Sequence, residues 1–412
     1  MTSIPSSSNH SPPSDYLTLY KHEPLNLSQQ SYRLCTLAPG QWDDPICCKI
    51  SVRPFSSTPE RYTALSYAWG NRTELCSLTV NGMTVWAQPN LWDALRAIRR
   101  RLRQPLVLWI DALCIDQNNV SERNHQVAIM GSIYRNAACV LVWLGPASKI
   151  SNATFDYFGG SKGNPGYLMI RYLLDQLFTR EYLTRAWIRQ EFILARRLIL
   201  FCGTKWLPWD PIEHFLYMES ISGSWAGWEK AKIPMQLSFY RKWPFVRTLN
   251  DLLIWLGAAK CSDLRDRVFS VLSLASELDG RAHEIADYSL DRYSLFFVIL
   301  DYLTIQYSKA TYMDASIGEE LYIRKISDYA KIIQIILEVE TKELIKTWNN
   351  AIGVMEWEAD NNTDKFSSAV KRFSGLRNWY HYRSSRRTWE LVSVAQTSHD
   401  QALSENPRFL II

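Results

Sequence analysis

Short apolar runs alternate with segments of helical periodicity between residues 62 and 144, and this alternation constrains the fold more than any other feature of the chain. Three runs have the length and composition of buried strands: residues 62–68, 106–110 and 140–144. Helical spacing separates them, over residues 91–102 behind Asn90 as N-cap and over a second segment behind Ser121 as N-cap. This order predicts an α/β fold in which helices flank a mainly parallel sheet.

Further elements are predicted on both sides of this region. Asn81-Gly82 favours a type I′ turn, so a β-hairpin is expected over residues 77–86. Other strands are expected over residues 46–52 and 198–202. Helical spacing predicts two helices between Tyr167 and Arg197, broken near Thr179, and later helices over 326–344 and 366–376. The tryptophan-rich stretch after residue 204 follows no single period and receives no assignment.

The chain is predicted to have four parts. The Ser- and Pro-rich start cannot bury enough apolar surface to offset the loss of chain entropy, which predicts a disordered leader. The predicted parts are the leader over 1–30, an α/β domain over 31–203, a mainly helical region over 204–310 and a further helical region over 311–412.

Composition excludes several classes of protein. The 46 Lys and Arg residues exceed the 41 Asp and Glu residues by too little to form a dense basic face, so no nucleic-acid partner is expected. The start lacks the features of a secretory signal, and no apolar run approaches the ~18 residues that cross a bilayer, so a cytoplasmic protein without an integral membrane segment is expected. The eight cysteines show no CxxC spacing, and no side chains have metal-ligand spacing, so neither a disulfide framework nor a metal site is expected.

Four separated segments resemble the fungal heterokaryon incompatibility (HET) domain family. They are YTALSYAWG over 62–70, LWIDALCIDQ over 108–117, VWLG over 142–145 and RAWIRQE over 185–191. Each segment is weak alone, but the four occur in the family's order. A later segment, DLRDRVF over 263–269, also looks like a family feature. Two positions depart from the usual pattern, because Asp116 stands where the family often has Asn and Leu264 where Pro is common.

The resemblance implies a role in non-self recognition between fungal individuals, where HET domains trigger cell death after incompatible fusion. It also implies a protein partner from an incompatibility system and a homo-oligomer as candidate associations. Participation in this response is a biological role and does not by itself specify a reaction.

The candidate site lies where the predicted parallel strands end. Ligands of open parallel sheets bind beyond the carboxyl ends of the strands. Tyr67, Trp69 and Gly70 follow one such end and Asp111 follows another, so they are expected to face a common crevice. The fourth segment adds Glu191, four residues after Trp187 and therefore expected on the same helical face.

The spacing of Trp187 and Glu191 is similar to that in the Toll/interleukin-1 receptor (TIR) domain, a flavodoxin-like α/β fold. Some TIR domains cleave NAD at the nicotinamide–ribose bond with the corresponding Glu. The resemblance therefore implies Glu191 as the catalytic residue of an NAD glycohydrolase, with Tyr67, Trp69, Gly70, Asp111 and Trp187 binding substrate. NAD would be the substrate, and no cofactor or metal is implied.

Structural explanations compete with this hypothesis. Glu191 could form a solvated helix ion pair with an arginine such as Arg185, and Asp111 could cap the loop after its strand. Trp69 and Trp187 could be ordinary core residues. The rival function is a non-catalytic signalling adaptor, which acts by self-association and partner recruitment.

Two further side chains were considered as reactive groups. Cys114 lies near Asp111, but no histidine is placed by sequence to activate a thiol nucleophile. His125 is isolated within a predicted helix, which favours a surface or packing role over that of a ligand.

Overall fold

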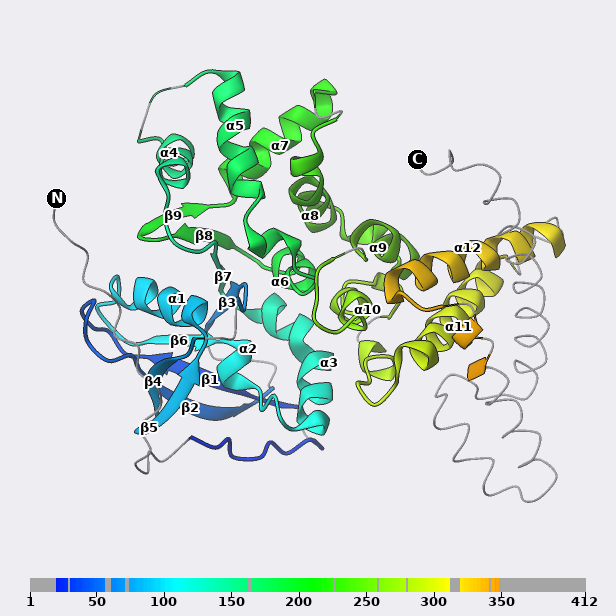
Figure 1. The fold of residues 1–412 in the computed structure, drawn as a ribbon, viewed down its shortest axis with the longest axis horizontal. Coiled ribbons are helices and arrows are strands. Elements are labelled where there is room, and N and C mark those ends of the chain that lie inside the picture. The colour runs from blue at the N-terminus through cyan, green and yellow to red at the C-terminus, as the bar shows by residue number, and fades with distance from the viewer. Residues whose placement is uncertain are drawn as a thin grey trace.

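The fold is organised around a mixed nine-stranded sheet (Figure 1). A computed structural model describes residues 20–347 apart from 29, 56–60, 71–73, 162, 164, 225–226, 258, 279–280, 312–318, 341 and 345. The strands are β1 (Ser31–Leu37), β2 (Cys47–Pro54), β3 (Thr63–Tyr67), β4 (Cys76–Val80), β5 (Met83–Ala87), β6 (Leu106–Trp109), β7 (Cys139–Trp143), β8 (Leu198–Cys202) and β9 (Lys205–Pro208). Their order across the sheet is β5-β4-β2-β1-β6-β3-β7-β8-β9.

The centre of the sheet is parallel. Strand β3 pairs in parallel with β6 on one side and with β7 on the other, and β7 pairs in parallel with β8. These pairings confirm that the three apolar runs belong to one sheet. In space the four strands follow the order second, first, third, fourth, which is the beginning of the flavodoxin-like order.

The outer strands make the sheet mixed rather than mainly parallel, because four of its eight pairings are antiparallel. Strand β1, which the sequence did not predict, pairs antiparallel with both β2 and β6. The predicted hairpin is confirmed as β4 and β5. Its turn residues Asn81 and Gly82 have φ values of 51° and 82°, as a type I′ turn requires.

The helices between the central strands start earlier than predicted. Helix α1 (Pro89–Arg99) begins with Pro at its first position, and its N-cap is Gln88 rather than Asn90. Asn90 instead accepts a 2.7 Å hydrogen bond from Trp143 Nε1 and donates to the carbonyl of Ala68. After the short α2 (Asp111–Cys114), helix α3 (Val120–Asn136) is capped by Asn119 and not by Ser121.

Helices also follow β7 and cover the β8–β9 end of the sheet (Figure 1). They are α4 (Lys149–Phe158), α5 (Tyr167–Phe178), the 3-10 turn η1 (Glu181–Thr184) and α6 (Ile188–Ile193). The break at Thr179 is confirmed, since Thr179 is the C-cap of α5. The unassigned tryptophan-rich stretch contains β9 and α7 (Asp210–Ser222), η2 (Glu229–Ala231), α8 (Lys232–Lys242), η3 (Pro244–Val246) and α9 (Leu249–Leu256).

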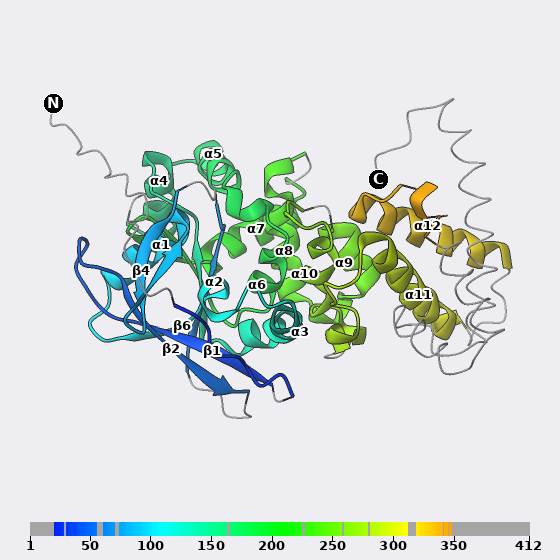
Figure 2. The same ribbon diagram turned by 60° about the horizontal axis from the view of Figure 1, so that its bottom comes forward.

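A helical region continues the chain away from the sheet. It contains α10 (Asp266–Leu272), η4 (Ser276–Leu278), η5 (Arg281–Glu284), α11 (Arg292–Thr311) and α12 (Glu319–Leu337). Figures 1 and 2 both place α11 and α12 side by side, far from the sheet. The helix predicted over 326–344 therefore starts earlier and ends at Leu337, and the one predicted over 366–376 lies outside the described residues.

One buried apolar cluster runs from the sheet into this helical region. This cluster continues across the predicted boundary at residue 203. The predicted boundaries at 203 and 310 both stay predictions. Of the predicted leader, residues 1–19 lie outside the described residues, and Tyr20 N donates to Thr84 O of β5. Across the described residues, every helix is too short or too polar to span a bilayer.

Candidate functional site

The candidate site forms where β3 and β6 end at the same edge of the sheet. Because these strands are parallel, Ser66 and Tyr67 at the end of β3 lie near Asp111, the first residue of α2 after β6. Helix α6 brings Glu191 to the same edge, where Ser66 Oγ donates a hydrogen bond to Glu191 Oε2. Segments far apart in the sequence thus meet at this edge of the sheet.

Asp111 forms the half-buried part of the site. Its Oδ2 accepts a 2.7 Å hydrogen bond from Trp69 Nε1, and its Oδ1 accepts a 2.7 Å bond from the backbone N–H of Ala112. Tyr67 also hydrogen-bonds Asp111. Burial nevertheless raises the pKa of Asp111, although the Arg185 cation and these hydrogen bonds oppose the rise.

Glu191 is the buried carboxylate of the site, with 2 % of its surface exposed. Burial is the largest cause that raises its pKa from 4.5 to about 7. The Arg185 cation and the Ser66 hydroxyl oppose this rise, whereas the Asp111 charge adds to it. Ser66 Oγ also lies 2.7 Å from the hydroxyl of Tyr182. Glu191 is therefore not the solvated ion-pair partner of the structural explanation.

Arg185 links the two carboxylates. Its Nη1 donates a hydrogen bond to the carbonyl oxygen of Tyr67, at the end of β3. Glu191 and Asp111 are the two charges that most strongly raise its pKa, against the lowering effect of burial. The site thus contains two carboxylates and one cation near buried hydroxyl groups.

Trp187 and Gly70 lie at the margins of this group. Trp187 is the N-cap residue of α6, and its side chain hydrogen-bonds Asp266 rather than any residue around Glu191. Trp187 therefore lies one helical turn before Glu191, but its side chain is engaged with Asp266. Gly70 has a φ of +78° after Trp69, and a Cβ there would lie 3.5 Å from Cβ of Asn90. It thus allows the turn that follows β3.

The described cavities do not include this group. The structure describes two large cavities, of about 990 and 900 Å³, and neither is lined by Tyr67, Trp69, Asp111 or Glu191. Chemically, the group offers a carboxylate that titrates near neutral pH, next to a half-exposed rim formed by Trp69 and Asp111. Such a carboxylate can stabilise a developing positive charge when it is ionised.

The other reactive groups considered from the sequence have different surroundings. Cys114 is fully buried, and burial raises the pKa of its thiol to about 12, which disfavours the nucleophilic thiolate. His125 lies on α3, where its Nδ1 is 3.0 Å from Gln126 Nε2. Among the described residues, no group of three or more His, Cys, Asp or Glu side chains is arranged to hold a metal ion.

Sequence reasoning missed Ser66, Tyr182 and the linking position of Arg185. Ser66 belongs to the first family-like segment and Arg185 to the fourth, so both lay within recognised motifs. The signal that could have found Arg185 is electrostatic, because two carboxylates expected at one sheet edge require a nearby cation.

Comparisons with known proteins find relatives over the part of the chain that forms this site. Residues 62–191 match the family model described as heterokaryon incompatibility protein (HET). A curated relative is heterokaryon incompatibility protein 6, OR allele, of Neurospora crassa, with 36 % identity over 153 residues. That match covers 34 % of this chain and 22 % of the relative's length. No solved structure matches the chain.

Proposed function

We propose that this HET-domain protein is a cell-death effector in fungal non-self recognition and acts by cleaving NAD at the nicotinamide–ribose bond. The protein would act in the cytoplasm with a protein partner from an incompatibility system. The Neurospora crassa relative is named for heterokaryon incompatibility, which supports the biological role. The buried Glu191, hydrogen-bonded at the end of a central parallel strand, is the observation that supports the chemistry.

The position of Glu191 suits this chemistry. In flavodoxin-like sheets, ligands bind beyond the carboxyl ends of the strands, where the strand order reverses. Here that point lies between β3 and β7, and Ser66 of β3 hydrogen-bonds Glu191. The strand order also supports the resemblance to TIR domains.

The proposed reaction needs one carboxylate. The bond between C1′ of the ribose and the nicotinamide nitrogen breaks, and its electron pair leaves with nicotinamide, which becomes neutral. Water adds to the oxocarbenium carbon and loses a proton, so the products are ADP-ribose, nicotinamide and one proton. Ionised Glu191 would stabilise the positive charge on the ribose, which is typically worth about 10² to 10³ in rate. Trp69 and Asp111, which are half-exposed and hydrogen-bonded to each other, would contact the substrate.

The test measures nicotinamide release from NAD by the purified full chain. Glu191→Gln keeps the size of the side chain and is expected to slow release by about 10² to 10³. Glu219→Gln is the matched control, because Glu219 is also buried, at 6 % exposure, but hydrogen-bonds Tyr167 outside the site. Since Glu191 must be ionised, the rate is also expected to fall about tenfold per unit below pH 7. Equal release by wild type and Glu191→Gln would refute the proposed chemistry.

A second candidate function is the non-catalytic adaptor, which would act as a homo-oligomer and recruit partners. The exposed aromatic side chains of α8 and the segment after it favour it, since Phe239, Trp243 and Phe245 are 50 %, 41 % and 71 % exposed. Expression of wild type and Glu191→Gln at matched abundance separates the two functions. Cell death with both variants and an unchanged NAD level would support the adaptor.

A further inference from the structure

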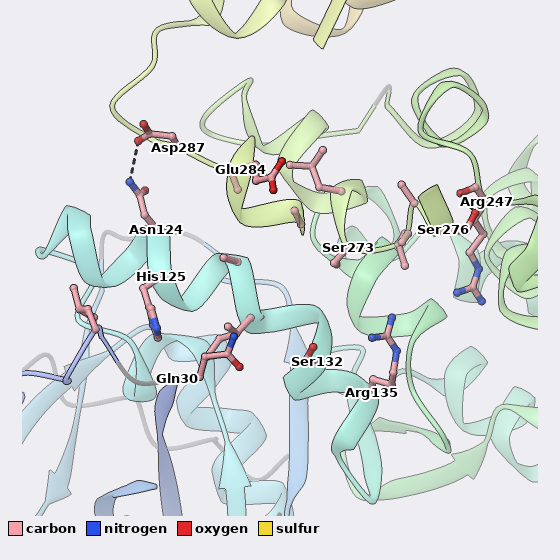
Figure 3. A pocket seen from close by; sticks show the side chains of 18 of the residues that line it. Gln30, Asn124, His125, Ser132, Arg135, Arg247, Ser273, Ser276, Glu284 and Asp287 are labelled. Carbon is pink, nitrogen blue, oxygen red and sulfur yellow. Dashed lines mark hydrogen bonds between the residues drawn. The ribbon is translucent and has the colours of Figure 1, made fainter. Parts of the chain in front are cut away.

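A cavity of about 990 Å³ lies between α3 and the helical region that follows the sheet. Helix α3 forms one wall, and the opposite wall comes from the residues around η3, the end of α10 and η5 (Figure 3). Its volume is at the upper end of the range for small-molecule sites, which is about 300 to 1,000 Å³. Apolar side chains such as Ile129, Leu272 and Leu274 line part of it.

Two arginines meet at one end of this cavity. Arg135 at the end of α3 and Arg247 after η3 point toward one another in Figure 3. Arg247 is 8 % exposed, and its Nε donates a 2.7 Å hydrogen bond to Tyr240 O. Arg135 is exposed, and within the described part of the chain neither guanidinium forms an ion pair with a carboxylate.

Arg247 lies close to two other cations. Its pKa is lowered from 12.5 to about 10, with burial as the largest cause and the cations Arg135 and Arg241 as the others. Two cations that face one another in a partly buried space repel, and a bound anion would replace this repulsion by attraction. Arginine pairs are well suited to phosphate, which their planar groups bind through two parallel hydrogen bonds.

Hydroxyl groups lie between the arginines and the middle of the cavity. Ser132, Ser273 and Ser276 all line it (Figure 3). Ser273 Oγ is buried and has no hydrogen-bond partner. Ser276 Oγ donates to the carbonyl of Arg247 at 3.2 Å. Ser273 Oγ packs against Gly131 of α3, so Ser132 and Ser276 are the hydroxyl groups left for a ligand.

The opposite end of the cavity is acidic. Glu284 and Asp287 lie there, away from the two arginines (Figure 3). Asn124 Nδ2 donates a 3.0 Å hydrogen bond to Asp287 Oδ1, and burial lowers the pKa of His125, so its imidazole is neutral at pH 7. A second anionic group would be repelled at this end, whereas an amine or a hydroxyl group would be favoured.

We propose that this cavity binds a small phosphomonoester, with its phosphate between Arg135 and Arg247 and a cationic or neutral polar end toward Glu284 and Asp287. The residues of the Glu191 site do not line this cavity, so the inference does not depend on the proposed NAD chemistry.

The experiment titrates the purified full chain by calorimetry with three probes: glucosamine 6-phosphate, inorganic phosphate and fructose 1,6-bisphosphate. The amine at one end of glucosamine 6-phosphate matches the acidic end, so it is expected to bind at least about tenfold more tightly than the bisphosphate. Arg135→Gln is expected to weaken its binding at least about tenfold, because one guanidinium–phosphate contact is lost. Arg103→Gln is the control, since Arg103 is also exposed and does not line the cavity. Glu284→Gln is expected to bring the affinities for glucosamine 6-phosphate and the bisphosphate closer together.

Arg135 is exposed, so its substitution should leave the melting temperature close to that of wild type. If Arg135→Gln fails to fold, Arg135→Lys keeps the charge but loses the planar fork, and it should still weaken binding. Equal affinity of wild type and the Arg135 variant would overturn the proposal. It would also be overturned if neither glucosamine 6-phosphate nor phosphate gave saturable binding up to about 10 mM.

Discussion

Replacing Glu191 by Gln is expected to stabilise the protein above neutral pH while it removes the proposed activity. Glu191 is buried, and its pKa is raised from 4.5 to about 7 in the folded protein. In the unfolded chain the carboxyl is exposed and titrates near its ordinary value. Ionised Glu191 therefore carries a free-energy cost that exists only in the folded state.

The sign and size of the effect follow from proton binding. Below about pH 4.5 the carboxyl is protonated in both states, and Glu191 contributes no pH dependence. Between about 4.5 and 7 only the folded state keeps the proton, so the free energy of unfolding falls as the pH rises. At about 1.4 kcal/mol per unit, the total loss is about 3 kcal/mol, and it is complete above pH 7. Glu191→Gln lacks this loss.

Denaturant unfolding of both proteins at several values between pH 5 and 8 measures the difference. The stability advantage of Glu191→Gln should grow with pH and level off at about 3 kcal/mol, while titrating groups outside the site cancel between the two proteins. If the two stabilities stayed parallel across this range, Glu191 would titrate alike in both states. The argument from burial would then be wrong.

Three further substitutions test the packing around the site and the sheet. Glu122→Gln breaks the buried ion pair with Arg33, whose Nη1 lies 2.5 Å from Glu122 Oε1, and should lower the free energy of unfolding by about 3 kcal/mol or more in urea titrations. Gly131→Ala would place a Cβ 2.5 Å from Ser273 Oγ and should cost about 1 to 3 kcal/mol in thermal unfolding. The second substitution Ser273→Gly should restore part of that loss, and an unchanged double variant would contradict the contact. Asn90→Ala leaves the N–H of Trp143 without its partner and should cost about 1 to 3 kcal/mol by the same assay, whereas a helix-capping role would predict a loss of about 1 kcal/mol or less.

The central strands could be predicted because local sequence determines them. Strands β6 and β7 are uninterrupted apolar runs, β3 is rich in strand-forming residues, and Asn81-Gly82 tolerates the positive φ values of its turn. Strand β1 could not be predicted in this way, because Arg33 interrupts its apolar pattern. Its charge is compensated in the core by Glu122, 89 residues further on, and its guanidinium also donates to the carbonyls of Cys114 and Glu23.

The helix caps were predicted less well, for a related reason. Asn90 and Asn119 have the same capping propensity, but only Asn119 accepts a bond from its helix, from the N–H of Glu122 at 3.1 Å. The Asn90 side chain instead hydrogen-bonds tertiary partners, Ala68 just after β3 and Trp143 at the end of the neighbouring β7. A side chain that serves two strands is not available to its helix, and only the folded arrangement decides between these uses.

The candidate site shows where such reasoning could be extended. The strand-end argument brought Asp111 and Glu191 to one edge of the sheet, and the structure places their charges close enough to raise the pKa of Glu191. Two carboxylates this near to each other in a buried setting would both tend to stay protonated unless a cation joined them. Arg185 and Arg189 both lie in the same motif as Glu191, but the direction of Arg185 depends on the turn between η1 and α6, where it reaches the carbonyl of Tyr67. The charge balance thus predicts that a cation is needed, whereas the identity of that cation depends on a tertiary hydrogen bond that the sequence does not reveal.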